Sequence, residues 1–369
     1  TYSFMNYGTE RNIPNGFVYT IIQANDGFLW VGTASGLTRF DGYNFFTVHF
    51  PDSSLGRYPT RCLKDKQGTL WFGCSDGTVL YEKENKLILV PVPNTKSISE
   101  LIEGPNGLIY IIPQGNSVFS VNPMKPEEVH HYFFSIEQAV FSASFTSSGN
   151  LLIGTQENLL VCKLEKDSVS VIKVIEGFDS NGVTAIYNTG DGVRFILGTA
   201  DNGLFQLKIS DKVDELTRLP DRQELKSLKV QSITKDSDGS YWISTSGSGV
   251  IKFELSENYE KVKSVKFYDL NSGLSGNDVR TVYQDIEGNY WFGLYGEGFS
   301  MMTSYSLSYY SPGKNSQENN ILYIKSYDNN YILGTPSGFH IFDQVNGKSL
   351  SFTDLTRYIG NTEIKSFYL

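Results

Sequence analysis

The chain has 369 residues and a formal net charge of -9 at pH 7; 40% of its residues are hydrophobic and 19% are charged. This acidic balance argues against nucleic-acid binding and against direct contact with an anionic membrane surface, because both need a basic face. No apolar run approaches the roughly 18–20 residues that span a bilayer. Tyrosine, phenylalanine and glycine are abundant, which favours strands and turns over helices.

The first clear pattern is a series of short β-branched and aromatic runs separated by turn residues. Residues 18–23 (VYTIIQ), 29–33 (LWVGT), 37–41 (LTRFD) and 45–50 (FFTVHF) each have the length of a strand. None has the 3.6-residue spacing of apolar side chains that indicates an amphipathic helix. The first fifty residues therefore predict consecutive strands joined by tight turns.

One motif from this region recurs along the chain. NDGFLWVGTASGL, which begins at Asn25, returns as KQGTLWFGCSDGT from Lys66, SDGSYWISTSGSGV from Ser237 and EGNYWFGLYGEGF from Glu287, with weaker copies elsewhere. Its central glycine has equivalents about every 43 residues, at Gly32, Gly73, Ile112, Gly154, Gly198, Ser244, Gly293 and Gly334. A period of this size with four strands inside it is typical of a propeller blade. The predicted fold is all-β, a β-propeller of four-stranded blades.

The residues of the motif have predicted structural roles. A hairpin turn at Asp26-Gly27 needs a positive φ, which glycine adopts without strain. Trp30 is expected to fill the wedge between neighbouring blades, and Gly36 to begin the third strand.

The same turn predicts a register for the first hairpin. Centring the hairpin on a two-residue turn pairs Thr20 with Thr33, and in the second copy it puts Cys62 opposite Gly73 and away from Cys74. A disulfide is therefore not expected. We interpret these two cysteines and Cys162 as small buried hydrophobic side chains.

The ends of the chain bear on the number of blades. Tyr2 to Asn6 align with the outermost strand of a repeat, and we expect them to complete the last blade, because closure removes exposed sheet edges. We favour a seven-bladed propeller over residues 1–310. Residues 311–369 would then supply the first blade and the start of a second, truncated propeller, and an eight-bladed ring is the alternative.

Two stretches carry a family likeness. Both resemble the two-component regulator propeller repeat; they are VYTIIQANDGFLWVGTASGLTRFDGYNFF and NSGLSGNDVRTVYQDIEGNYWFGLYGEG. The resemblance implies the periplasmic sensor region of a hybrid two-component regulator of polysaccharide-degrading gut bacteria, with two propellers, a β-sandwich, a membrane helix, a histidine kinase and a response regulator. It implies that the region senses products of polysaccharide breakdown and regulates the genes for their use.

The expected partners follow from that likeness. They are an oligosaccharide ligand, the remaining propeller and sandwich domains of the same chain and, in the full-length protein, a second copy in a homodimer. A propeller scaffold that docks another polypeptide is an alternative, and a polysaccharide-active enzyme is a weaker one.

Catalysis, a metal and a cofactor are not expected. The chain has four histidines, and His130 and His131 lie in a strand-like run, where alternation would point their rings to opposite faces. GTASG, from Gly32, is not followed by a helix whose N-terminus could hold a phosphate. DSDGSYW, from Asp236, resembles the aspartate box of sialidases but coincides with the propeller hairpin.

A binding site is expected on the face where two sets of loops surround the channel mouth. These are the loops that lead into the innermost strands and those between second and third strands. The candidates for ligand binding are Arg11, Arg57, Asp76, Asp201, Asn202, Tyr295 and Glu297. Planar polar side chains and aromatic rings hold sugars, and arginine suits an acidic or sulfated sugar. Arg11, Arg57 and Tyr295 are favoured.

Overall fold

The computed structural model divides the chain into two compact units, Thr1–Ser304 and Tyr305–Leu369. It describes residues 4–52, 57–93, 95–179, 181–210, 214–219, 225–257, 259, 261–303, 320–327, 330–336, 338–343 and 349–354. The division falls a few residues before the predicted boundary between residues 310 and 311. In the described residues no helix is long and apolar enough to cross a membrane.

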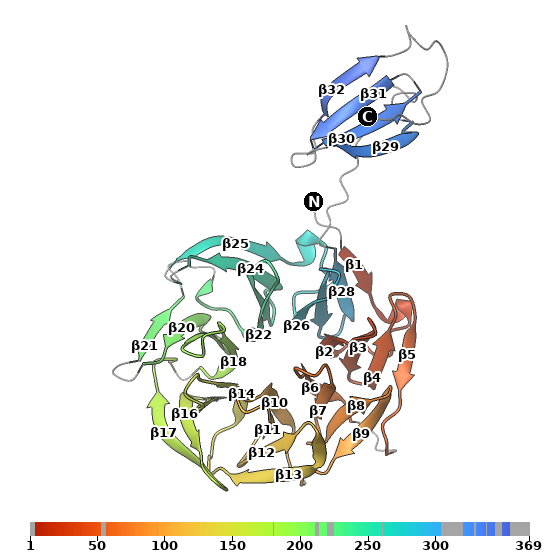
Figure 1. Cartoon of the computed structure of the whole chain (residues 1–369). Helices are drawn as coiled ribbons and strands as arrows, with labels where there is room; N and C mark the ends of the chain where they lie inside the picture. The colour runs from red at the N-terminus through yellow and green to blue at the C-terminus, as the bar shows by residue number, and fades with distance from the viewer. Residues whose placement is uncertain are drawn as a thin grey trace. The chain divides into compact units, whose positions relative to one another are not determined.

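The described strands of the first unit form seven four-stranded antiparallel sheets around a central axis (Figure 1). The innermost strands are β2 (Val18–Gln23), β6 (Pro59–Lys64), β10 (Ile98–Glu103), β14 (Val140–Phe145), β18 (Val183–Asn188), β22 (Val230–Lys235) and β26 (Val279–Gln284). The second strands are β3 (Leu29–Thr33), β7 (Leu70–Cys74), β11 (Ile109–Pro113), β15 (Leu151–Thr155), β19 (Arg194–Thr199), β23 (Tyr241–Thr245) and β27 (Tyr290–Leu294).

The third strands are β4 (Gly36–Phe40), β8 (Val79–Lys83), β12 (Ser117–Asn122), β16 (Leu159–Leu164), β20 (Leu204–Lys208), β24 (Val250–Leu255) and β28 (Phe299–Met302). The outermost strands are β5 (Phe45–Val48), β9 (Lys86–Val90), β13 (Lys125–Phe133), β17 (Val169–Ile175), β21 (Glu215–Arg218), β25 (Val262–Tyr268) and β1 (Phe4–Tyr7). Two short 3-10 helices are η1 (Thr9–Arg11) and η3 (Leu270–Ser272). The predicted all-β propeller fold is confirmed.

The second unit contains one described sheet. Strands β29 (Tyr323–Tyr327), β30 (Asn330–Thr335), β31 (Gly338–Asp343) and β32 (Ser349–Asp354) pair in that order. This sheet has the strand order of a blade. Whether it opens a second propeller stays a prediction.

The N-terminal strand closes the ring of the first unit. β1 pairs antiparallel with β28, with Phe4 opposite Met302 and Tyr7 opposite Phe299. This confirms the predicted outermost strand for its described part, while Tyr2 lies outside the described residues. Innermost strand β2 also contacts both β6 and β26, so the sheets close on one another without the eighth repeat.

A side chain of the first blade reinforces the same closure. The Gln23 amide Nε2 donates to Glu287 Oε2 at 3.1 Å, and the Ile286 backbone N–H donates to Gln23 Oε1 at 2.8 Å. Both partners lie in the loop between β26 and β27. The first and last blades are therefore linked by side-chain hydrogen bonds as well as by the shared sheet.

The predicted register of the first hairpin was wrong by one residue. Thr20 pairs with Gly32 instead of Thr33, and Cys62 pairs with Phe72 instead of Gly73. The cause is a three-residue loop, closed by the Ala24 N–H bonded to the Phe28 carbonyl at 2.9 Å. A loop of this length combines a type I turn with a left-handed residue, here Gly27 at a φ of 88°.

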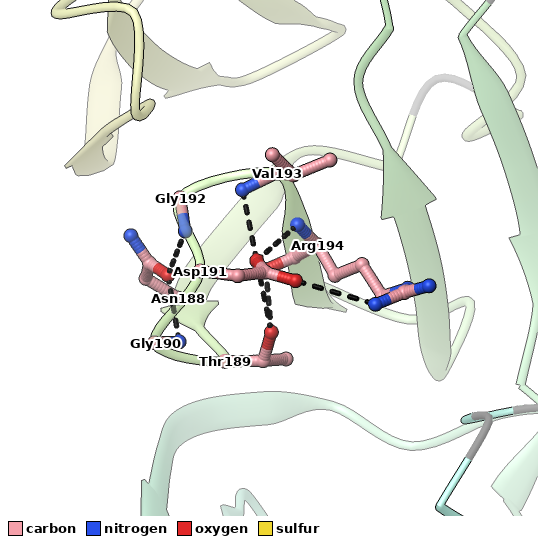
Figure 2. Close-up of polar contacts among 7 residues, drawn as sticks. All are labelled: Asn188, Thr189, Gly190, Asp191, Gly192, Val193 and Arg194. Carbon is pink, nitrogen blue, oxygen red and sulfur yellow. Dashed lines mark hydrogen bonds and ion pairs between the residues drawn. The ribbon is translucent and has the colours of Figure 1, made fainter.

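The corresponding loop of the fifth blade is longer and is held by side chains. Figure 2 shows the Asp191 carboxylate accepting the backbone N–H groups of Val193 and Arg194, at 2.9 and 2.7 Å. The Asn188 Oδ1 accepts from Gly190 and Gly192. Burial would raise the pKa of Asp191, but the hydrogen bonds from Arg194 and Val193 bring it below its ordinary value.

The large aromatic side chains of the second strands lie between blades, as predicted. Trp30 stacks on Phe72 of the next blade, with ring centroids 5.6 Å apart. Trp291 of the last blade contacts Tyr7 and Phe40, and all three are buried. Each inter-blade wedge is thus filled by apolar side chains from both sides.

A polar contact that the sequence prediction missed accompanies three of these tryptophans. The indole Nε1 groups of Trp71, Trp242 and Trp291 donate to aspartates six residues earlier, at 2.7–2.8 Å. The aspartates are Asp65, Asp236 and Asp285. The other carboxylate oxygen of each accepts backbone N–H groups of the hairpin loop. One side chain therefore fixes the loop and orients the inter-blade indole.

Candidate ligand-binding site in the axial channel

The loops predicted to share one face are joined in every blade by the same hydrogen bond. In each blade, the residue after the second strand donates its backbone N–H to the backbone carbonyl of the residue just before the innermost strand. The pairs are Ala34 to Phe17, Ser75 to Tyr58, Gln114 to Ser97, Gln156 to Ala139, Ala200 to Gly182, Ser246 to Lys229 and Tyr295 to Asp278. These bonds of 2.8–3.1 Å hold both loop sets at one end of the ring.

Each innermost strand of the ring contains a β-bulge at its second residue. The register shifts fall between Val18 and Thr20 in the first blade and at the equivalent position in the other six. The bulged residues are Tyr19, Thr60, Ser99, Phe141, Thr184, Gln231 and Arg280. A bulge redirects the side chain of its extra residue. We call these seven residues the bulge ring.

The bulge ring lines a cavity on the axis. All seven residues contribute to a cavity of about 350 Å³, which also touches Ser97 and Gln114 at the loop face. A second cavity of about 180 Å³ continues along the strands, past Arg61, Cys62 and Glu100. Because residues from opposite blades line both, these cavities together form the axial channel of the ring.

Three hydroxyl groups of the bulge ring are used to join neighbouring blades. Thr60 donates to the Ile98 carbonyl at 2.9 Å, Ser99 to the Val140 carbonyl at 2.7 Å, and Thr184 to the Val230 carbonyl at 2.7 Å. These contacts fix the spacing of the innermost strands. The larger side chains, those of Tyr19, Phe141, Gln231 and Arg280, are left to shape the channel.

Aromatic rings gather where the first, second and last blades meet. Tyr19 stacks on Tyr58 with centroids 4.8 Å apart, and Phe17 meets Tyr295 edge-on at 4.6 Å. Phe17 and Tyr295 are 37% and 41% exposed, so their faces are accessible. Burial, with the neighbouring Tyr58 and Tyr295, raises the pKa of Tyr19 to about 12. Its phenol therefore stays neutral and able to donate a hydrogen bond.

Two arginines of the channel lack a carboxylate partner. The Arg280 Nη1 donates to Gln231 Oε1 at 2.7 Å, and its guanidinium lies 4.3 Å from the Tyr295 ring centre. The Arg61 Nη1 donates to the Thr60 carbonyl at 2.9 Å. Among the described residues neither arginine has a carboxylate oxygen within 4.0 Å. Burial raises the pKa of Glu100 in the same channel, and Arg61 opposes that shift.

The structure brings two of the predicted site residues together in an ion pair. Arg57 Nε lies 2.8 Å from Asp76 Oδ2, and Arg57 Nη1 lies 2.5 Å from Asp52 Oδ1. The Arg57 side chain is only 7% exposed. Arg57 and Asp76 are thus already engaged with the protein itself, and neither lines the axial channel.

The remaining predicted residues are dispersed. Arg11 is exposed on η1, with its guanidinium 5.6 Å from the Tyr7 ring centre. Asn202 is buried and bonded to Asp179 Oδ2 at 2.9 Å, while Asp201 and Glu297 are exposed in loops. Of the predicted set, Tyr295 adjoins the channel, through Arg280. As ligand contacts, these residues remain predictions.

The sequence contained a signal for the bulge ring. The first residue of each innermost strand is Val, Pro or Ile, while the next is Tyr, Thr, Ser, Phe, Thr, Gln or Arg in successive blades. A constant apolar position followed by a variable one distinguishes the blade-building residue from the channel-lining residue. The sequence prediction placed the variable, ligand-contacting residues in the loops and missed this position.

No grouping of three or more His, Cys, Asp and Glu side chains suited to a metal occurs in the part of the chain that the structure describes. The neighbouring histidines make separate contacts, His130 with the Lys166 carbonyl and His131 with Ser117 Oγ. They therefore point away from each other, as the predicted alternation requires.

Comparison with known proteins gives one family match. Residues 12–35, 224–247 and 273–296 match the two-component regulator propeller. No curated protein matches the chain. The matched segments agree with the resemblance found in the repeats, and each of the three overlaps a strong copy of the motif, beginning at Asn25, Ser237 and Glu287.

Solved structures share the fold at low sequence identity. The extracellular domain of the putative hybrid two-component system BT3049 from B. thetaiotaomicron is 20% identical with a TM-score of 0.66, over 96% of this chain and 50% of that one. The corresponding domain of BT4673 from B. thetaiotaomicron is 14% identical with a TM-score of 0.64, over 95% and 46%. Virginiamycin B lyase from Staphylococcus aureus is 14% identical with a TM-score of 0.63, over 83% and 99%. The chain thus spans about half the length of the first two.

Proposed function

We propose that this chain, which contains three segments that match the two-component regulator propeller, is the ligand-sensing module of a hybrid two-component signalling protein. The module would lie in the periplasm, bind an oligosaccharide from polysaccharide breakdown and regulate the genes for its use. Support comes from the matched repeats and from the neighbouring folds, which are extracellular domains of putative hybrid two-component systems.

The observation that carries the proposal is the axial channel. Its wider cavity of about 350 Å³ falls within the range of about 300–1,000 Å³ usual for small-molecule sites. The bulge ring surrounds it with aromatic, amide and guanidinium groups, each rigidly mounted on a strand. Aromatic faces and oriented polar groups are the combination that recognises a sugar ring.

The same geometry suggests how occupancy could be relayed. A ligand in the channel would touch side chains from opposite blades, such as Tyr19 and Thr184. It would therefore bind more tightly to one spacing of the blades than to another. Such a difference in affinity between two conformations is what a conformational signal requires. The conformational change would be transmitted to the remaining domains of the chain and to a second copy in a homodimer.

The proposal is for binding without turnover. Cys62 lines the channel, but burial raises the pKa of its thiol to about 12, so it is a poor nucleophile near neutral pH. The hydroxyls of Thr60 and Thr184 already donate to backbone carbonyls. These groups are arranged to hold strands and a ligand.

Calorimetric titration with a panel of plant and host oligosaccharides tests the proposal. We expect one class to bind wild-type protein, with no new product on chromatography after prolonged incubation. Tyr19→Phe should weaken that binding, because it removes a channel hydroxyl while keeping the ring. Tyr43→Phe is the matched control, because Tyr43 is 90% exposed and lies outside the channel. Product formation would favour an enzyme, and failure of every sugar to bind would favour a protein-docking scaffold.

A further inference from the structure

We propose that the axial channel recognises an anionic group of its saccharide, a uronate carboxylate or a sulfate ester, between Arg61 and Arg280. The inference rests on the proposed function and narrows it to one ligand chemistry. It moves the expected anion contact from the loop residue Arg57 to two arginines on the innermost strands.

Arg280 is held in place but is not neutralised. It is the bulged residue of β26, so its side chain is directed into the channel. The contacts with Gln231 Oε1 and with the Tyr295 ring fix the plane of the guanidinium. Its Nε is buried without a hydrogen-bond partner among the described residues. Donors of a fixed guanidinium suit the two oxygens of a carboxylate or sulfate.

Arg61 provides the second positive charge. It follows the bulged residue Thr60 on β6 and lines both cavities, as Arg280 does. Within the described part of the chain, its side chain donates to a carbonyl oxygen, which orients the side chain and does not cancel its charge. The two arginines come from the second and seventh blades, so an anion between them would link separate blades.

The arginines outside the channel provide a contrast. Arg39 pairs with Asp26 at 2.8 Å, Arg57 pairs with Asp52 and Asp76, and Arg194 pairs with Asp191 at 3.3 Å. In an acidic chain of net charge -9, carboxylates are plentiful. Arg11 and Arg218 also lack a carboxylate within 4.0 Å among the described residues, but neither lines the channel. What distinguishes Arg61 and Arg280 is that two arginines without a carboxylate partner line the same cavity.

The surroundings concentrate the positive potential. Glu100 is the one carboxylate among the described residues that line the two cavities. Burial raises its pKa, so it opposes the arginines less than an exposed glutamate would. Clefts lined by one sign of charge and walled by protein focus the field on an entering ligand. A neutral sugar would leave both guanidinium groups without a carboxylate or sulfate oxygen within 4.0 Å among the described residues.

Matched pairs of saccharides provide the test. Trigalacturonate is compared with its carboxyl-reduced neutral counterpart, and a sulfated disaccharide with its unsulfated form, by calorimetric titration of the whole chain. We expect one anionic member to bind at least tenfold more tightly than its neutral partner. The bound member identifies the anion as a carboxylate or a sulfate. Raising the salt from about 50 to 500 mM should weaken this binding, because charge screening increases.

Variants assign the effect to the channel. Arg280→Gln and Arg61→Gln should each reduce the affinity for the anionic saccharide at least tenfold, and Arg280→Lys should restore part of it. Arg194→Gln is the matched control, since the Arg194 side chain is 35% exposed and lies outside the channel. Arg11→Gln tests the loop site predicted from the sequence. Circular dichroism and the thermal midpoint establish that each variant is folded.

The outcomes separate this inference from the proposed function. Equal binding of anionic and neutral members, unchanged in Arg280→Gln, would overturn the anion site and leave the sensor proposal standing. Loss of affinity in Arg11→Gln but not in Arg280→Gln would overturn it as well. If no saccharide binds, the proposed function fails and this inference fails with it.

Discussion

The indole Nε1 of Trp71 donates a 2.8 Å hydrogen bond to Asp65 Oδ2, six residues earlier, across the hairpin that joins β6 to β7. Asp236 and Trp242 repeat this relationship in the sixth blade, where Lys252 Nζ also lies 3.0 Å from the carboxylate. The first blade lacks it. Ala24 occupies the aspartate position, and the Trp30 Nε1 is buried without a partner among the described residues.

Ala24→Asp should therefore stabilise the first blade. Arg39 pairs with Trp30 in the ladder as Lys252 pairs with Trp242, and the Arg39 Nε is also buried without a partner. The new carboxylate would meet both donors, and we expect a gain of about 1 kcal/mol in the free energy of unfolding. Urea titration measures it, with Ala24→Leu as a control that adds bulk without an acceptor. An equal or lower stability for Ala24→Asp would contradict the role assigned to the aspartate.

Asp236 should make stability dependent on pH. Burial would raise the pKa of Asp236, but hydrogen bonds from Trp242, Lys252 and Tyr290 bring it below its ordinary value. A carboxyl with a depressed pKa in the folded state contributes stability that is present above about pH 4 and is lost as the pH falls through the folded value.

Comparison of wild-type protein with Asp236→Asn over the range of about pH 2.5–6 checks this. We expect the variant to be less stable near neutral pH and to lose less stability on acidification. Asp201→Asn is the control, because Asp201 is exposed. If the free energy of unfolding fell equally with acidification in wild type and Asp236→Asn, other carboxyl groups would control the loss of stability in acid.

Tyr7→Ala should weaken the closure of the ring. Tyr7 is 7% exposed and stacks on Phe299 at 4.9 Å while meeting Phe40 edge-on at 5.2 Å. Removing a buried ring of this size costs about 3–5 kcal/mol. Chemical unfolding followed by tryptophan fluorescence measures the loss, and Tyr43→Ala on the exposed surface should change stability by less than about 0.5 kcal/mol. Similar losses of unfolding free energy in both variants would contradict a specific role of Tyr7 in closing the ring.

Arg57→Gln should affect stability more than ligand binding. The change leaves Asp76 and Asp52 without their shared buried cation, and we expect a loss of about 1–3 kcal/mol. The affinity for the saccharide identified by titration should stay within about twofold of wild type, a free-energy change below about 0.5 kcal/mol. The sequence-based hypothesis that Arg57 contacts the ligand gives the opposite result, a large loss of affinity in a folded protein.

Features that depend on the period of the repeat could be predicted from the sequence. Trp30 recurs at a fixed distance from a turn glycine, so its place between blades follows from strand alternation and blade packing. The closing strand at Phe4–Tyr7 was predictable because it aligns with a repeat element that has no preceding blade.

Features that depend on local backbone conformation were not predicted. Asp26-Gly27 fits both a two-residue and a three-residue loop, and the choice between them shifts every pair in the hairpin by one. The bulge that directs Arg280 into the channel leaves no trace in hydrophobic alternation alone. The ion pair of Arg57 with Asp52 joins loop residues whose approach is set by tertiary structure. The candidate site therefore shifted from the loops to the strands.

The pairing of Phe4 with Met302 also has a consequence for the order in which the protein can fold. Among the strands of this ring the ribosome makes β1 first, but the sheet that receives it is complete only when β28 has emerged, almost three hundred residues later. The first-made strand must therefore wait unpaired while the intervening blades form. Ring closure is the last and least local step of folding, and a chain halted before β28 would leave both its first blade and its N-terminal strand open to other partners.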